Sequence, residues 1–109
     1  MAFISLATSA DLEAALAQEW AVLYKHSNRC WICSLAVRQV RRFAESHPET
    51  PVYQVDVIEG WEISNALAQS LGIPHRSPQA LVVNSGRVVW HASHFGVKAR
   101  SLAGARGGV

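Results

Sequence analysis

The two cysteines of this chain, Cys30 and Cys33, are the residues whose type and spacing most clearly predict chemistry. Residues three apart lie on one face of a helix, and Cα atoms one helical turn apart fall within the range that a disulfide tolerates. Two thiols that can close and open such a ring form a redox couple. The segment Cys30-Trp31-Ile32-Cys33 therefore predicts thiol–disulfide chemistry.

The expected start of a helix at this pair predicts different roles for the two sulfurs. Cys30 would stand at the helix N-terminus, where unpaired N–H groups and the positive end of the dipole favour a thiolate. We expect Arg29 and Lys25 to add positive charge nearby, and Arg29 to contact the bound substrate. Cys33, one turn into the helix, should be more buried. Cys30 is thus the expected nucleophile and Cys33 the resolving thiol.

Two other interpretations of the cysteines are available. Buried free cysteines often behave as small hydrophobic residues. A pair of this spacing can also form half of a zinc site, but zinc takes four ligands and no second cysteine pair exists. His26 is the one local candidate for a further ligand. We expect a redox site with no metal and no organic cofactor.

Ser77 and Pro78 form the second candidate element of the site. They precede an apolar run, at the place where a thioredoxin-like fold has a cis-proline loop facing the reactive cysteine. A cis bond at Pro78 would leave the backbone of Ser77 free to pair with an extended substrate. A trans proline that stiffens the loop is the alternative. Trp31 is expected to be exposed beside the sulfur as an apolar wall for a docked thiol, or else to pack on its own helix.

The surrounding pattern alternates strands and helices. Strands are predicted near residues 3–6, 21–24, 52–57, 80–83 and 87–90, with a polar loop at 25–29. Helices are predicted from Thr8 or Ser9, over residues 31–46, from about 60 to 71, and from near 97. This order implies an α/β fold whose mixed central sheet ends in an antiparallel hairpin and has helices on both faces. A C-x-x-C motif at a strand-to-helix junction of such a pattern is typical of a thioredoxin-like redox site.

Composition limits the remaining possibilities. The 109 residues suffice for one domain, 1–109, with residues 103–109 expected to fray. A formal charge of +2 without a dense basic block argues against nucleic acid as a partner. No apolar stretch is long enough for a membrane span, and the N-terminus has no secretory pattern. We expect a cytoplasmic monomer with no membrane partner.

Several ordered segments resemble the YtxJ-type, or monothiol, bacilliredoxins of the thioredoxin superfamily. The similarity covers roughly residues 3 to 103. The matching stretches are Tyr24-Lys25-His26-Ser27 with Cys30, Pro51-Val52-Tyr53, Asp56-Val57-Ile58-Glu59, Ile63-Ser64-Asn65, Leu71-Gly72-Ile73 with His75, Ser77-Pro78-Gln79, and residues 86–94.

The resemblance implies a thioredoxin-like fold and a cytosolic thiol–disulfide oxidoreductase that reduces bacillithiol mixed disulfides on client proteins. Bacillithiol, a low-molecular-weight thiol, would be the co-substrate, and Cys30 matches the reactive cysteine of the family. That family typically has serine at position 33 and often proline at position 31, so Cys33 and Trp31 depart from it. The alternatives are a general thioredoxin-type dithiol reductase and a non-catalytic redox-sensing or binding module.

Overall fold

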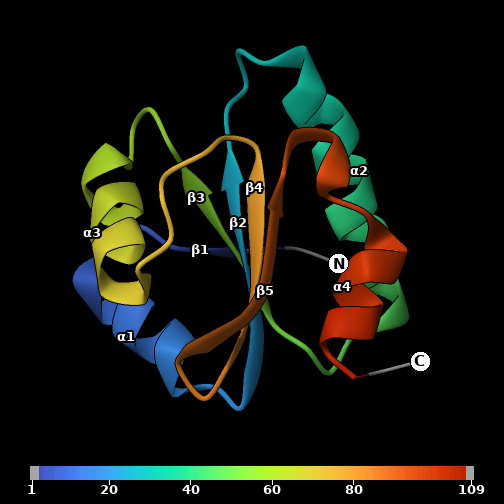
Figure 1. The fold of residues 1–109 in the computed structure, drawn as a ribbon. Helices are drawn as coiled ribbons and strands as arrows, with labels where there is room; N and C mark the ends of the chain where they lie inside the picture. Colours follow the sequence, from blue (N-terminus) through green and yellow to red (C-terminus); the bar gives the residue numbers. More distant parts are fainter. Residues whose placement is uncertain (1–2, 108–109) are drawn as a thin grey trace.

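The computed structural model of the chain describes residues 3–107, which form a five-stranded sheet with helices on both faces (Figure 1). The strands are β1 (Ile4–Ser5), β2 (Trp20–His26), β3 (Val52–Asp56), β4 (Gln79–Asn84) and β5 (Arg87–Ser93). The helices are α1 (Ser9–Ala17), α2 (Trp31–Ser46), α3 (Trp61–Leu71), α4 (Ala99–Ala105) and the short 3₁₀ helix η1 (His94–Gly96). The predicted α/β, thioredoxin-like fold is confirmed.

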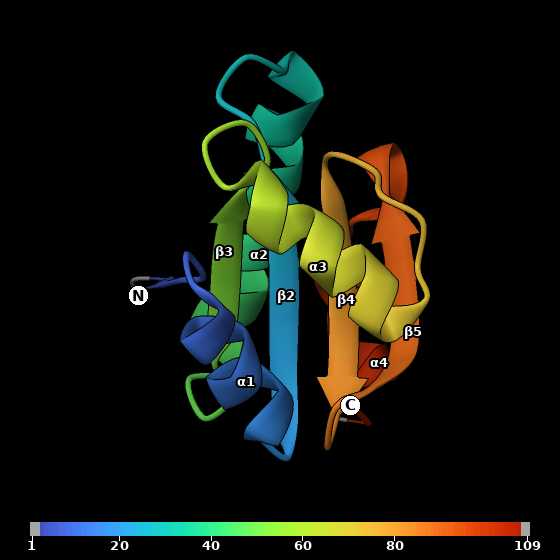
Figure 2. The same ribbon diagram turned by 90° about the vertical axis from the view of Figure 1, so that its left-hand side faces the viewer.

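The sheet is mixed, in the order β1-β3-β2-β4-β5. Strands β1, β3 and β2 run parallel, whereas β4 pairs antiparallel with both β2 and β5. Helices α1 and α3 cover one face, and α2 and α4 cover the other (Figures 1 and 2). Each face has its own apolar core because side chains alternate along the central strands. On β2, for example, Val22 and Tyr24 face α2, while Ala21 and Leu23 face α1 and α3.

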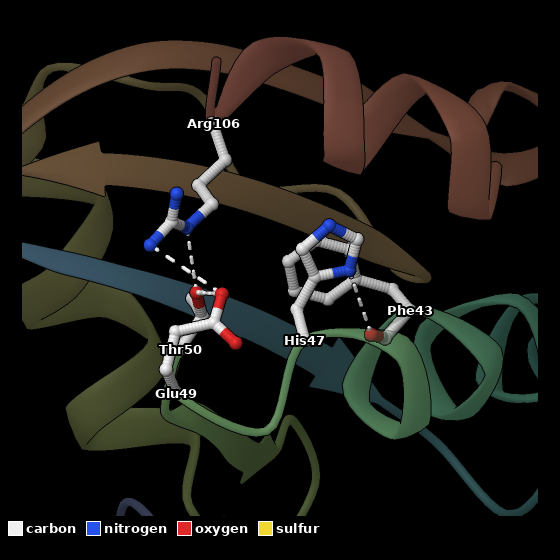
Figure 3. Close-up of polar contacts among 5 residues, drawn as sticks. All are labelled: Phe43, His47, Glu49, Thr50 and Arg106. Atoms are coloured by element: carbon white, nitrogen blue, oxygen red, sulfur yellow. Dashed lines mark hydrogen bonds and ion pairs between the residues drawn. The ribbon is translucent and has the colours of Figure 1, made fainter. Parts of the chain in front are cut away.

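Helix α2 has the bounds that the sequence predicts, Trp31 to Ser46. Its buried face repeats with a helical period and comprises Cys33, Ala36, Val37, Val40, Phe43 and Ala44. The helix stops before Pro48, which cannot continue it. His47 completes the end: its backbone N–H and its ring Nδ1 lie 2.9 and 3.2 Å from the carbonyl oxygen of Phe43 (Figure 3).

The polar loop predicted over residues 25–29 begins later than expected. Lys25 and His26 belong to β2, and Lys25 is completely buried. A charged residue at the end of an apolar run usually marks the point where a strand reaches the surface. Here, however, the parallel pairing of β2 with β3 continues to His26, which lies opposite Asp56. The loop is therefore limited to residues 27–30, directly before α2.

The C-terminal segment, where fraying is predicted from residue 103, includes the last turn of α4. Residues 103–105 complete α4, and Leu102 is fully buried; residues 108 and 109 lie outside the described part of the chain. Arg106 anchors the end of the helix (Figure 3). Its Nε donates to Thr50 Oγ1 at 2.7 Å, its Nη2 lies 3.5 Å from Glu49 Oε2, and its guanidinium lies over the ring of Trp20 at 5.6 Å.

No helix within residues 3–107 combines the length and apolar character that crossing a membrane requires.

Candidate active site

Cys30 and Cys33 lie at the junction of the loop after β2 and the first turn of α2. Cys30 is the N-cap residue, with extended backbone angles, and the N–H of Cys33 donates to its carbonyl oxygen at 3.1 Å. Both cysteines are free thiols; Cys30 is partly exposed and Cys33 is completely buried. The predicted difference in burial between the two sulfurs is therefore present.

The surroundings shift the pKa values of the two thiols in opposite directions. The backbone N–H of Cys33, helped by the Cys33 thiol and the N–H of Ile32, holds the pKa of Cys30 below its ordinary value although partial burial opposes this. Burial raises the pKa of Cys33, and the backbone of Ser27 and the hydroxyl of Ser77 only partly offset it. This arrangement makes Cys30 the more readily ionised thiol, and hence the nucleophile, and keeps the proton on Cys33 to higher pH.

The loop before β4 faces the pair, as predicted. The Oγ of Ser77 lies 3.8 Å from the Sγ of Cys33. The Ser77–Pro78 peptide bond is cis, and Pro78 is buried. The carbonyl oxygen of Pro78 accepts the N–H of His94, which ties this loop to the start of η1.

Trp31 projects into solvent beside Cys30, with 68% of its surface exposed. Its ring lies 6.1 Å from that of Phe95, centroid to centroid, and Phe95 is itself exposed. The two rings form an apolar surface at the mouth of the site. Arg29 is exposed too, but within residues 3–107 its side chain makes no hydrogen bond or ion pair. The predicted binding roles of Arg29, Trp31, Ser77 and Pro78 remain predictions.

Lys25 does not contribute its charge to Cys30 in the way the sequence suggested. It belongs to the face of the sheet that α1 and α3 cover, and its Nζ lies 3.0 Å from Nδ1 of His75. The same Nδ1 lies 3.2 Å from the hydroxyl of Ser64 on α3. The thiolate of Cys30 is therefore favoured by N–H groups at the start of α2 and not by Lys25.

Through His75, Lys25 contacts the loop that carries Ser77 and Pro78. Gln79, opposite Lys25 in the β2–β4 register, donates from Nε2 to the carbonyl oxygen of Pro74 at 3.1 Å. Its Oε1 is buried without a hydrogen-bond partner within the described residues. These two contacts hold Pro74 against β4 and His75 against β2. Sequence reasoning missed this cluster because Lys25 and His75 alone lie 50 positions apart.

Tyr24 lies in the strand predicted over residues 21–24, but sequence reasoning did not predict its contacts with the cysteine pair. Its hydroxyl donates to the carbonyl oxygen of Cys33 at 3.3 Å and lies 2.8 Å from Nδ1 of His26. Nε2 of His26 lies 3.0 Å from Oδ1 of Asn28. Burial, and then the charges of Cys33 and Cys30, raise the pKa of Tyr24, so its hydroxyl stays protonated. The period-two pattern of β2, which turns Tyr24 toward α2, was the available signal.

Within residues 3–107 no three His, Cys, Asp or Glu side chains are grouped so that they could hold a metal ion.

Comparisons with known proteins agree with this fold and show the family of the chain. Residues 4–102 match the family model described as monothiol bacilliredoxin BrxC. A solved structure described as a candidate oxidoreductase with a thioredoxin fold is 27% identical, with a TM-score of 0.88, over 94% of this chain and 92% of that one. Thioredoxin from Fasciola hepatica is 22% identical, with a TM-score of 0.73, over 94% of each chain. Thioredoxin from Trypanosoma brucei brucei is 14% identical, with a TM-score of 0.79, over 96% of this chain and 88% of that one. The two thioredoxins show the fold alone.

Proposed function

Because this chain belongs to the monothiol bacilliredoxin BrxC family of thioredoxin-fold oxidoreductases, we propose that it reduces bacillithiol mixed disulfides on proteins through Cys30 and Cys33. The observation that carries this proposal is that the two sulfurs differ in exposure and in the direction of their pKa shifts. Cys30 is accessible with a lowered pKa, whereas Cys33 is buried one turn later with a raised pKa. A nucleophile and a protonated reserve thiol are what a two-step disulfide exchange requires.

In the first step the Cys30 thiolate attacks the bacillithiol sulfur of the mixed disulfide. The S–S bond of the substrate breaks, a new S–S bond joins bacillithiol to Cys30, and the client leaves as a thiolate that takes up a proton. The exposed ring of Trp31 lies beside the attacking sulfur and supplies an apolar contact for the incoming group.

In the second step Cys33 loses its proton and attacks the sulfur of Cys30. Bacillithiol leaves and is protonated, and a Cys30–Cys33 disulfide forms, so the two electrons of the dithiol have passed to the client. The hydroxyl of Ser77 lies 3.8 Å from the Cys33 sulfur. Two further bacillithiol molecules, or a dithiol reductant, return the pair to its reduced form.

Intact-mass measurement tests both steps. After incubation with bacillithiol disulfide, Cys33→Ser should accumulate one bacillithiol adduct on Cys30, whereas the wild type should lose two hydrogens as the internal disulfide forms. Glutathione disulfide is the control for the thiol class and should give much less adduct. Cys30→Ser should stay unmodified and should fail to release bacillithiol from a modified client. Release of bacillithiol by Cys30→Ser would contradict the mechanism.

The presence of a second, buried thiol also supports a general dithiol reductase of thioredoxin type as the alternative. Tyr24 occupies the position where many thioredoxins have a buried acid, and its hydroxyl stays protonated. The lack of an acid at this position argues against an efficient thioredoxin. Insulin reduction coupled to a thioredoxin reductase separates the two functions. Rapid turnover there, with equal reactivity toward glutathione and bacillithiol disulfides, would favour the alternative.

A further inference from the structure

A groove between α2 and the η1–α4 segment begins beside the cysteine pair and is lined by positive charge. It consists of two adjoining cavities of about 550 and 280 Å³, which share Gln39, Arg42 and Lys98. Figure 1 shows α2 and α4 side by side on the same face of the sheet. The charged residues in its lining are Arg38, Arg42, Lys98 and Arg100, and neither cavity has an aspartate or a glutamate in its lining.

These four cations have no carboxylate partner within the part of the chain that the structure describes. The ion pair found among residues 3–107 is that of Arg106 with Glu49. Most of the acidic residues lie elsewhere: Asp11, Glu13, Glu19, Asp56, Glu59 and Glu62 belong to α1, the β3–α3 connection or their immediate neighbours. Glu45 is on α2 but does not line the groove. The chain is thus basic on its α2–α4 face although its formal net charge is only +2.

The groove is continuous with the active site. The smaller of its two cavities is lined by Phe95 and by Ile32, which lies between the two cysteines. The ring of Phe95 is 6.1 Å from that of Trp31, and the N–H of Ile32 helps to lower the pKa of Cys30. A polypeptide whose disulfide reaches Cys30 can therefore continue over the Trp31–Phe95 surface into the groove.

We propose that the α2–α4 groove binds an acidic segment of the client polypeptide next to the disulfide that is reduced; this rests on the proposed oxidoreductase function. The lining runs along α2 from Ile32 to Ser46, which is about 21 Å at 1.5 Å per residue. An extended peptide covers that length with about six residues. The groove therefore fits a stretch of chain rather than a single small anion.

The positions of the charges predict where the acidic residues lie in the client. Arg38 and Arg42 are about 12 and 18 Å along the helix axis from Cys30. Glutamates or aspartates should therefore stand roughly four to six residues from the client cysteine. Four unpaired cations attract such a segment at low ionic strength, and added salt screens the attraction.

The test compares two peptides that carry a cysteine as its mixed disulfide with thionitrobenzoate. One peptide has glutamates four to six residues from the cysteine, and the other has glutamines there. Cys30 attacks the peptide sulfur, thionitrobenzoate leaves, and its absorbance gives the rate constant. The full-length wild type should react about tenfold faster with the glutamate peptide at low salt, and the difference should nearly disappear at high salt.

Two single charge reversals isolate the groove. Arg42→Glu, at the residue shared by both cavities, should abolish the preference for the glutamate peptide, and Lys98→Glu should weaken it in the same way. Arg87→Glu on β5 changes the net charge equally, lies outside both cavities and should retain the preference. Equal rates for the two peptides with the wild type would overturn the proposal, as would equal losses in Arg42→Glu and Arg87→Glu.

A second measurement does not depend on redox chemistry. A labelled glutamate peptide with serine in place of its cysteine should bind the wild type in fluorescence anisotropy and bind Arg42→Glu at least severalfold more weakly. Because neither assay contains bacillithiol, a failure of the bacillithiol assignment leaves both results interpretable. Binding that is identical in the wild type and Arg42→Glu would refute the groove as the docking site.

Discussion

Replacing Lys25 with methionine should remove a pH dependence of folding stability that the wild-type chain has in the alkaline range. Lys25 is completely buried in β2, and its Nζ contacts Nδ1 of His75 with no carboxylate nearby to form an ion pair within residues 3–107. Burial lowers the pKa of its ammonium group from 10.5 to about 8. Methionine has a similar length and no titratable group.

The size of the effect follows from this shift. Between pH 8 and 10.5 the unfolded chain still binds the Lys25 proton while the folded chain has released it, so the free energy of unfolding rises with pH. Below pH 8 the cost of burying the charge is present in full. One pKa unit corresponds to about 1.36 kcal/mol, so a shift from 10.5 to about 8 predicts a rise of about 3 kcal/mol across this interval.

Chemical denaturation at a series of pH values, under a non-thiol reductant, measures this rise. The difference between the wild-type and Lys25→Met curves isolates Lys25, because the cysteines and tyrosines titrate in both proteins. Lys98→Met, at an exposed lysine, is the matched control and should follow the wild type. Parallel curves for the wild type and Lys25→Met from pH 8 to 10 would refute the argument that Lys25 is buried as a costly charge.

Three further substitutions test other contacts. In Cys33→Ser the pKa of the Cys30 thiol, measured by thiolate absorbance, should lie below the ordinary value of 9.0, because the N–H groups at positions 32 and 33 remain. A pKa at or above that value would contradict the role of these groups. Tyr24→Phe removes the hydroxyl that donates to the carbonyl of Cys33 and should lower the free energy of unfolding by about 1 kcal/mol. The control is Tyr53→Phe, because the hydroxyl of Tyr53 makes no such bond, and it should leave this free energy unchanged. Equal losses in the two variants would count against the contact. Arg106→Ala removes the contacts with Thr50, Glu49 and Trp20. It should lower the free energy of unfolding by about 1–2 kcal/mol, measured by thermal or chemical denaturation, and should shift the tryptophan fluorescence. An unchanged denaturation midpoint would mean that α4 does not depend on this anchor.

Sequence patterns predicted the elements whose causes are local. Helix α2 has its predicted ends because its apolar face repeats with a helical period and Pro48 follows. The β4–β5 hairpin was predicted from two β-branched runs around Asn84-Ser85-Gly86, and both Ser85 and Gly86 take positive φ angles there. Strands β2, β4 and β5 proved longer than predicted and β1 and β3 shorter; pairing with β4 extended β5 through the polar residues to Ser93.

The wrong prediction concerns a residue whose partner is distant in the sequence. Lys25 was assigned to a loop because a charged side chain usually lies in water, yet it is buried and contacts His75, 50 positions away. The contacts at the C-terminal end were also beyond local patterns. Arg106 reaches Thr50, 56 positions earlier, and Leu102 of α4 is buried.

By itself the amino-acid sequence determined that the two thiols of this protein lie together, because residues three apart at the start of a helix need only local geometry to meet. It also determined the order of strands and helices, which depends on periodicity within each segment. Only the tertiary structure decided what surrounds the pair: the hydroxyls of Ser77 and Tyr24, the buried lysine behind the loop, and the basic groove that begins at Ile32. Those neighbours come together through the sheet order and the packing of α4 on α2, and contacts of that kind leave no period or spacing in the sequence.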